Sequence, residues 1–176
     1  MKPVIGTILI LFLALTSYPA IDRAEIETLF QNQKYAILLE KCITLLNRPA
    51  APLSSEDKEF LNYHIAASYQ KSGNLQIAKS YFRKLEKSYP NGRYIPFVYE
   101  ALAELNRKNR VVWLSYIRKL ASGSPKTPEA FDANMELGKE YIRQRKFNYA
   151  INTFEKIVNE WGMGNRNPES YILLTM

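Results

Sequence analysis

The chain has 176 residues, of which 47% are hydrophobic, and its formal net charge is +7 at pH 7. The excess of Lys and Arg favours anionic partners, but it does not choose among membranes, nucleic acids and acidic proteins. A single Cys excludes an internal disulfide framework and a Cys-based zinc site, and a single His excludes a His-based metal cluster.

The N-terminus has the pattern of a secretory signal. Lys2 precedes an apolar run over residues 4–15, and small or polar residues follow as far as Ala20. The run is too short for a comfortable transmembrane helix, which needs about 20 apolar residues. Cleavage after Ala20 is expected, and the alternative is an uncleaved anchor through residues 4–15. No Cys follows the run, so a lipoprotein anchor is not indicated.

Helical periodicity continues from residue 21 and comes in pairs. The first pair covers 21–31 and 34–46, and the prolines at 49 and 52 end it. Ser54 and Ser55, followed by acidic residues, are expected to cap the next helix, which runs to about Lys71, and its partner covers 75–89. The third pair covers 95–106 and 110–121. Thr127 is expected to cap the fourth pair, 129–144 and 147–161. A short helix, 168–176, is predicted last.

The second pair has the clearest pattern. Ala66 and Ala67 give its first helix a small-residue face, and Gly73 lies in a tight polar turn. Leu75, Ala78, Phe82 and Leu85 share one face of its second helix, and Pro90 and Gly92 end the unit. This pattern predicts two antiparallel helices packed through small residues.

The same pattern recurs 72 residues later. Ala66, Tyr69, Leu75, Ala78 and Phe82 correspond to Gly138, Tyr141, Phe147, Ala150 and Phe154. A weaker unit lies between them, with Ala101, Trp113, Ile117 and Leu120 at matching places. The weakest unit comes first, with Leu29, Tyr35, Leu38, Cys42 and Leu45. Cys42 is therefore expected in the core, as a small hydrophobe rather than a reactive thiol.

These units resemble tetratricopeptide repeats (TPRs), which are helix pairs of about 34 residues. The expected repeats are about 21–52, 59–92, 94–127 and 131–164, within one domain over 21–176. The resemblance implies an all-α fold: a right-handed superhelical stack of antiparallel helix pairs, with about nine helices and a concave groove.

The links between repeats are also similar to those of bacterial envelope TPR proteins. Two groups share the pattern: the outer-membrane assembly lipoprotein that docks onto the barrel-folding machine, and the periplasmic coordinator associated with the Tol-Pal system. The resemblance implies a non-catalytic scaffold or adaptor in the periplasm or envelope that binds a protein or peptide in its groove. The alternative is a basic repeat protein that binds an anionic polymer or membrane surface, such as lipopolysaccharide, anionic lipid or nucleic acid. Nucleic acid is not favoured, because a secretory signal argues against it.

No catalytic constellation is visible, and no cofactor or metal is expected. His64 is expected to be partly solvated beside Phe60 or Ser68. Glu136 and Glu140 are one helical turn apart, a spacing that more often marks a solvated face balanced by Lys139 and Arg143. No glycine-rich phosphate loop follows a strand.

Three surfaces are predicted. The groove candidates lie on the first helix of each pair, unless some of them pack between repeats: Phe60, Tyr63, Gln70, Val98, Leu102, Met135, Lys139 and Arg143. They suggest an apolar wall with a basic end, suited to a peptide with an acidic terminus. A basic edge should follow the turns within repeats, either as a soluble edge or as a contact for anions: Lys34, Lys71, Arg107, Lys108, Arg110, Arg143, Arg145 and Lys146.

The C-terminal helix supplies the third surface, a docking patch of Tyr171, Ile172 and Leu174. An exposed apolar patch of this kind usually marks a contact site. It would hold a homodimer or another protein partner, and the alternative is a simple capping helix.

Overall fold

The computed structural model describes residues 21–48, 53–123 and 127–161. Over these residues the chain is all-α, with eight helices and no strand, as the sequence predicts. The helices are α2 (Arg23–Gln31), α3 (Tyr35–Leu46), α4 (Ser55–Lys71), α5 (Leu75–Ser88), α6 (Ile95–Leu105), α7 (Arg110–Gly123), α8 (Pro128–Arg143) and α9 (Phe147–Trp161). The N-terminal segment 1–20 and the predicted helix 168–176 lie outside the described residues.

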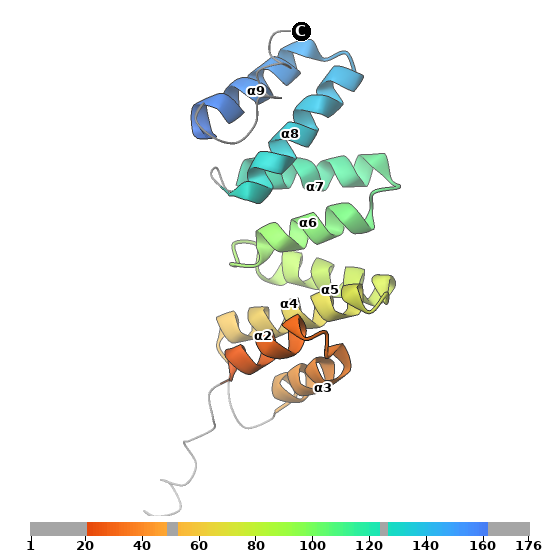
Figure 1. The fold of residues 1–176 in the computed structure, drawn as a ribbon, viewed down its shortest axis with the longest axis vertical. Coiled ribbons are helices and arrows are strands. Elements are labelled where there is room, and N and C mark those ends of the chain that lie inside the picture. The colour runs from red at the N-terminus through yellow and green to blue at the C-terminus, as the bar shows by residue number, and fades with distance from the viewer. Residues whose placement is uncertain (1–20, 49–52, 124–126, 162–176) are drawn as a thin grey trace, which may run out of the picture.

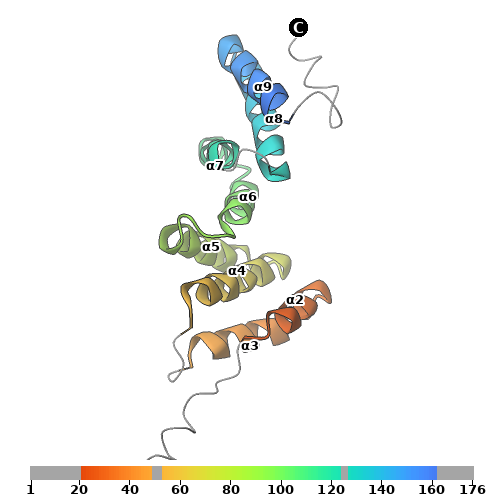
Figure 2. The same cartoon turned by 90° about the vertical axis from the view of Figure 1, so that its left-hand side faces the viewer.

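The helices form an elongated stack of four antiparallel pairs (Figure 1). Each helix packs against the next in the chain, and α2 also contacts α4 while α6 contacts α8. The first helices of the pairs, α2, α4, α6 and α8, lie on one side of the stack, and α3, α5 and α7 lie on the other (Figure 2). The row of first helices bends, so that α2 and α8 lie farther to the right in Figure 2 than α6 between them. The predicted TPR-like stack is therefore confirmed.

The predicted capping residues hold the starts of two first helices. The side chain of Ser54 accepts a hydrogen bond from the Asp57 N–H at 3.0 Å, and that of Thr127 accepts one from the Ala130 N–H at 3.2 Å. Each cap satisfies a backbone N–H that has no partner inside the helix. Glu56 and Asp57 lie in the first turn of α4, where the helix dipole favours negative charge.

The turn within the repeat is the same in three of the four pairs. The N–H groups of Lys34, Asn74 and Lys146 donate to the carbonyls of Leu29, Tyr69 and Tyr141 at 2.8–2.9 Å. The residue before each donor, Gln33, Gly73 or Arg145, has a φ between 56° and 81°. Only Gly73 adopts this left-handed conformation without a Cβ penalty. The shared turn confirms the predicted register of the weak first repeat.

The core runs through the stack as three clusters of buried side chains. One lies among α2, α3 and α4, a central one spans α4 to α8, and a small one joins α8 to α9. Cys42 is fully buried in the first cluster, and burial raises the pKa of its thiol to about 12. The expected core role of Cys42 is confirmed, since so high a pKa leaves almost no nucleophilic thiolate.

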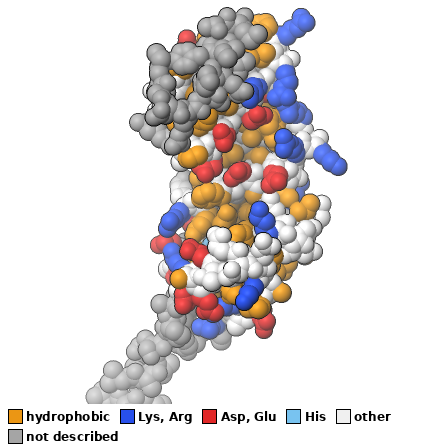
Figure 3. Space-filling model, viewed as in Figure 1, with side chains coloured by type: hydrophobic (Ala, Val, Ile, Leu, Met, Phe, Trp, Pro, Cys, Tyr) orange, Lys and Arg blue, Asp and Glu red, His pale blue; other side chains and the backbone are white. Residues whose placement is uncertain are grey.

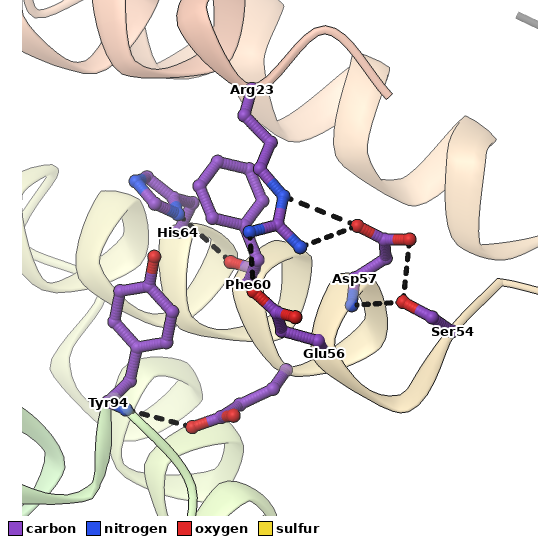
Figure 4. Close-up of polar contacts among 8 residues, drawn as sticks. Arg23, Ser54, Glu56, Asp57, Phe60, His64 and Tyr94 are labelled. Atoms are coloured by element: carbon purple, nitrogen blue, oxygen red, sulfur yellow. Dashed lines mark hydrogen bonds and ion pairs between the residues drawn. The ribbon is translucent and has the colours of Figure 1, made fainter. Parts of the chain in front are cut away.

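Polar contacts tie neighbouring repeats together (Figure 4). The guanidinium of Arg23 in α2 lies 5.0 Å above the Phe60 ring and pairs with Glu56 at 2.8 Å and Asp57 at 2.7 Å. The buried carboxylate of Glu59 in α4 accepts a hydrogen bond from the Tyr94 N–H, just before α6, at 2.9 Å. A Cβ on Gly92 would lie 2.1 Å from this carboxylate, so a side chain at position 92 would displace the group that accepts the hydrogen bond.

Candidate functional site

Half of the predicted groove residues lie in the core. Phe60, Val98 and Leu102 are fully buried and Met135 is 4% exposed, so the prediction that they line a groove is wrong. The reason is that a first helix packs against helices on several sides. In α4, for example, nine side chains between positions 59 and 68 are buried. Helical periodicity identifies a buried face, but it does not separate a face turned to a groove from one covered by the next repeat.

The other four groove candidates reach the surface. Tyr63, Gln70 and Lys139 are half-buried, and Arg143 is exposed. The Gln70 side chain donates a hydrogen bond to the Glu104 carboxylate at 3.0 Å, which links α4 to α6. Arg143 pairs with Glu140 at 3.2 Å. These residues come from different repeats and do not form one site.

An aromatic patch lies where α4 meets the start of α6. The rings of Tyr63 and Tyr94 stack with centroids 4.5 Å apart, and Phe97 lies 6.1 Å from Tyr63. The Phe97 side chain is 40% exposed. Tyr63 is more buried, and this burial raises the pKa of its hydroxyl to about 12. We call Tyr63, Tyr94 and Phe97 the aromatic patch. Tyr63 was predicted, but Tyr94 was not, because it precedes the helix and is brought there by the link between repeats.

An acidic cluster continues the same face along α6 and α8. Its members, Glu100, Glu104, Glu129, Asp132 and Glu136, are spaced three or four residues apart on their helices, which places them on one side of each. The pKa of the Glu100 carboxyl is raised, first by burial and then by the nearby carboxylates of Glu129, Glu104 and Asp132. Glu100, Glu129, Asp132 and Glu136 border a cleft of about 260 Å³ that has Ile117 and Leu120 in its lining.

The charge of this face differs from the prediction. Figure 3 shows acidic side chains gathered among apolar ones over the upper half of the stack, with basic side chains along the edge beside them. The expected apolar wall with a basic end is therefore not found along α6 and α8, where acidic side chains lie among the apolar ones. The spacing of the acidic residues is visible in the sequence, whereas the net charge of +7 does not reveal it.

All eight residues of the predicted basic edge are exposed. They belong to the turns α2–α3, α4–α5, α6–α7 and α8–α9, and all four turns lie on the right-hand side of the stack in Figure 1. Two residues of the basic edge, Arg110 and Arg143, form ion pairs with Glu140. Glu140 is buried, contrary to the expected solvated face. The hydrogen bond that Arg110 donates to Glu140 is the main reason why the pKa of the Glu140 carboxyl is lowered.

Within the described residues, no cluster of three or more His, Cys, Asp or Glu residues could hold a metal ion. His64 is only 6% exposed, so the expectation of partial solvation is wrong, although its ring does lie beside Phe60 with centroids 4.3 Å apart. Within residues 21–48, 53–123 and 127–161, no helix is long and apolar enough to cross a membrane.

Comparison with known proteins supports the repeat class. Residues 61–92 match the family model of the tetratricopeptide repeat. The matched range contains most of α4 and all of α5, and the turn between these helices recurs in α2–α3 and α8–α9. A search of curated proteins finds no match to this chain. Tetratricopeptide repeats generally bind protein partners, so the chain has the architecture of a protein-interaction scaffold. The C-terminal docking patch of Tyr171, Ile172 and Leu174 lies outside the described residues.

Proposed function

We propose that this protein is a non-catalytic scaffold that binds a partner through the face of its first helices. The bound segment would present Lys or Arg to the acidic cluster and an apolar residue to the aromatic patch. The observation that carries the proposal is the cleft that Glu100, Glu129, Asp132 and Glu136 border, with Ile117 and Leu120 in its lining. The carboxylates of Glu129 and Asp132 help to raise the pKa of Glu100, so they repel one another there, and a bound cation would remove that repulsion.

The geometry of the face suits an extended or helical peptide. The aromatic patch on α4 and α6 leads directly to the acidic cluster on α6 and α8, so one segment can contact both. Peptide-binding surfaces of this kind combine apolar contacts for affinity with charged groups for specificity. Because the face carries carboxylates where the sequence predicts an apolar wall with a basic end, the proposed partner is a basic segment and not the expected acidic terminus.

A charge-reversal variant tests the proposal. Peptides that combine Lys and Phe are expected to bind to the protein, and matched peptides with Glu in place of Lys are not. Glu104→Lys with Asp132→Lys should weaken that binding at least tenfold, which corresponds to a loss of about 1.4 kcal/mol. The control is Glu40→Lys with Glu155→Lys, two exposed acidic residues on α3 and α9 that change the net charge equally. Equal loss of binding in both pairs would show that net charge, and not this face, holds the peptide.

We also propose that the scaffold works in the bacterial envelope, in the assembly of the outer membrane or another envelope structure. The support is the signal-like N-terminus, with Lys2 before an apolar run over 4–15, together with links similar to those of envelope TPR proteins. Fractionation of cells expressing the full chain tests this, and recovery in the cytosolic fraction would rule it out.

A further inference from the structure

The turns within the repeats carry exposed apolar side chains as well as cations. Eight large apolar residues among those described are exposed by 40% or more. Six of them lie in the first turn of a second helix, directly after the turn within the repeat: Ile37, Leu75, Ile77, Val111, Phe147 and Tyr149. Val111 is 81% exposed and Phe147 57%. We call these six residues, with the eight cations of the basic edge, the turn edge.

The turn edge forms one side of the molecule. The four turns project on the same side of the stack in Figure 1, so their side chains face a common surface. The first helices lie along a different side of the stack, as Figures 1 and 2 together show. An object bound along the turn edge would therefore leave the acidic cluster and the aromatic patch accessible.

The turn edge is free of acidic side chains in the sequence. Residues 28–39, 69–85, 105–122 and 141–154, which contain the four turns, include no Asp or Glu. Arg110 and Arg143 pair with Glu140, but no described carboxylate forms an ion pair with Lys34, Lys71, Arg107, Lys108, Arg145 or Lys146. Six of the eight cations of the turn edge therefore have no ion pair with a described carboxylate.

We propose that the turn edge binds an anionic membrane surface, with cations at the phosphates and apolar side chains in the interface. The combination of cations and exposed apolar side chains indicates which kind of partner the turn edge binds. A nucleic acid would place phosphates against the side chains of Leu75, Ile77 and Phe147, which gain nothing from them. An acidic protein would need a contiguous apolar patch for the core of its interface, but these side chains are dispersed over four turns. A bilayer accepts each side chain separately and attracts cations electrostatically.

A fluorescent label at the edge tests the contact in the full chain. The natural thiol, Cys42, is fully buried with its pKa raised to about 12, so an introduced surface Cys labels selectively. NBD is attached at Val111→Cys on the turn edge or at Lys87→Cys, an exposed position near the other end of α5. Vesicles of phosphatidylcholine containing phosphatidylglycerol should brighten and blue-shift the label at position 111 and not at position 87. Pure phosphatidylcholine should produce a weaker response at 111.

The fluorescence of the label at position 111 reports contact at the turn edge even if the apolar N-terminal run itself binds lipid. The chain would then associate with vesicles without any change at position 111, and that result would overturn the proposal. A response at 111 to polyglutamate, with none to vesicles, would assign the surface to an acidic protein instead. A response at 111 to unlabelled protein alone would assign it to a second copy of this chain.

Charge-reversal variants test the electrostatic part. Lys71→Glu with Lys146→Glu should lower vesicle binding by about 30-fold or more, given the usual contribution of each cation near an anionic surface. Lys87→Glu with Arg93→Glu is the matched control with the same net charge, since both residues are exposed away from the turns. Binding should also weaken between about 0.1 M and 1 M salt, as the Debye length falls from about 10 Å to about 3 Å. Equal losses in the two pairs would contradict a contact at the turn edge.

Discussion

At the scale of single residues, His64 differs most from its expected environment. Its Nδ1 lies 2.9 Å from the Phe60 carbonyl oxygen, and the rings of Phe30, Phe60, Tyr63 and Tyr94 surround it. Burial disfavours the imidazolium and lowers the pKa of His64, although the hydrogen bond to Phe60 and the charge of Glu27 act against this. The folded protein therefore keeps His64 neutral at a pH where an unfolded chain would protonate it.

This difference predicts a loss of stability in mild acid. The unfolded chain binds the proton more readily, so the contribution of His64 is complete above a pH of about 6.5 and is lost as the pH falls through the lower folded-state pKa. Each unit by which the pKa is lowered corresponds to about 1.4 kcal/mol.

Thermal melts of the natural protein and of His64→Phe at pH 7.5 and 5.5 measure this loss. The natural protein should lose more stability than the variant. Glu100 acts in the opposite direction, because its pKa is raised, but it is present in both proteins. Identical pH dependence would mean that His64 is solvated.

At the scale of helices, the fourth repeat depends on one close contact. Gly138 in α8 faces Phe154 in α9, and a Cβ at position 138 would lie 2.4 Å from the Phe154 ring. The cluster between these helices is small, with Met135, Ala150, Phe154 and Ile157 as its buried members. A ring displaced by a methyl group has little other apolar surface to occupy there, so the α8–α9 pair should be sensitive at this position.

Gly138→Ala is therefore expected to destabilise the protein by about 1–3 kcal/mol, the usual cost of overpacking. Amide hydrogen exchange should accelerate in α8 and α9 more than in α4 and α5, because repeats contact mainly their neighbours. Gly123→Ala provides the control, since a Cβ there meets nothing within 4 Å. If the two variants melt alike, the proposed contact between α8 and α9 is not formed.

At the scale of the whole molecule, the stack separates opposite charges onto adjacent sides. The first helices of the third and fourth repeats carry the acidic cluster, while the turns within repeats carry the cations. The formal charge of +7 is therefore a total that includes surfaces of opposite sign, and these have different expected partners. A scaffold built in this way could hold a basic segment on one side while its turn edge rests on a membrane, which would place the bound partner beside the lipid surface.

The sequence by itself determined the helices, their pairing and the repeat register. These depend on local information: capping by Ser54 and Thr127, breaks at prolines, and apolar residues at helical spacing. The weak first repeat has the same turn as the second, because Leu29, Tyr35 and Leu38 keep the spacing that the turn requires. The basic edge was also predictable, since turns within repeats must lie at one end of every pair.

Only the tertiary structure decided which side chains of the first helices face solvent. Phe60, Val98, Leu102 and Met135 have the spacing of groove residues, yet the neighbouring repeats cover them. The tertiary structure also decided that Glu59, Glu140 and His64 are buried. The partners of Glu59 and Glu140 lie on other elements, and His64 lies in an aromatic cluster that several helices form. A helix in a stack is contacted on several sides at once, and periodicity within one helix does not specify which neighbour covers which side.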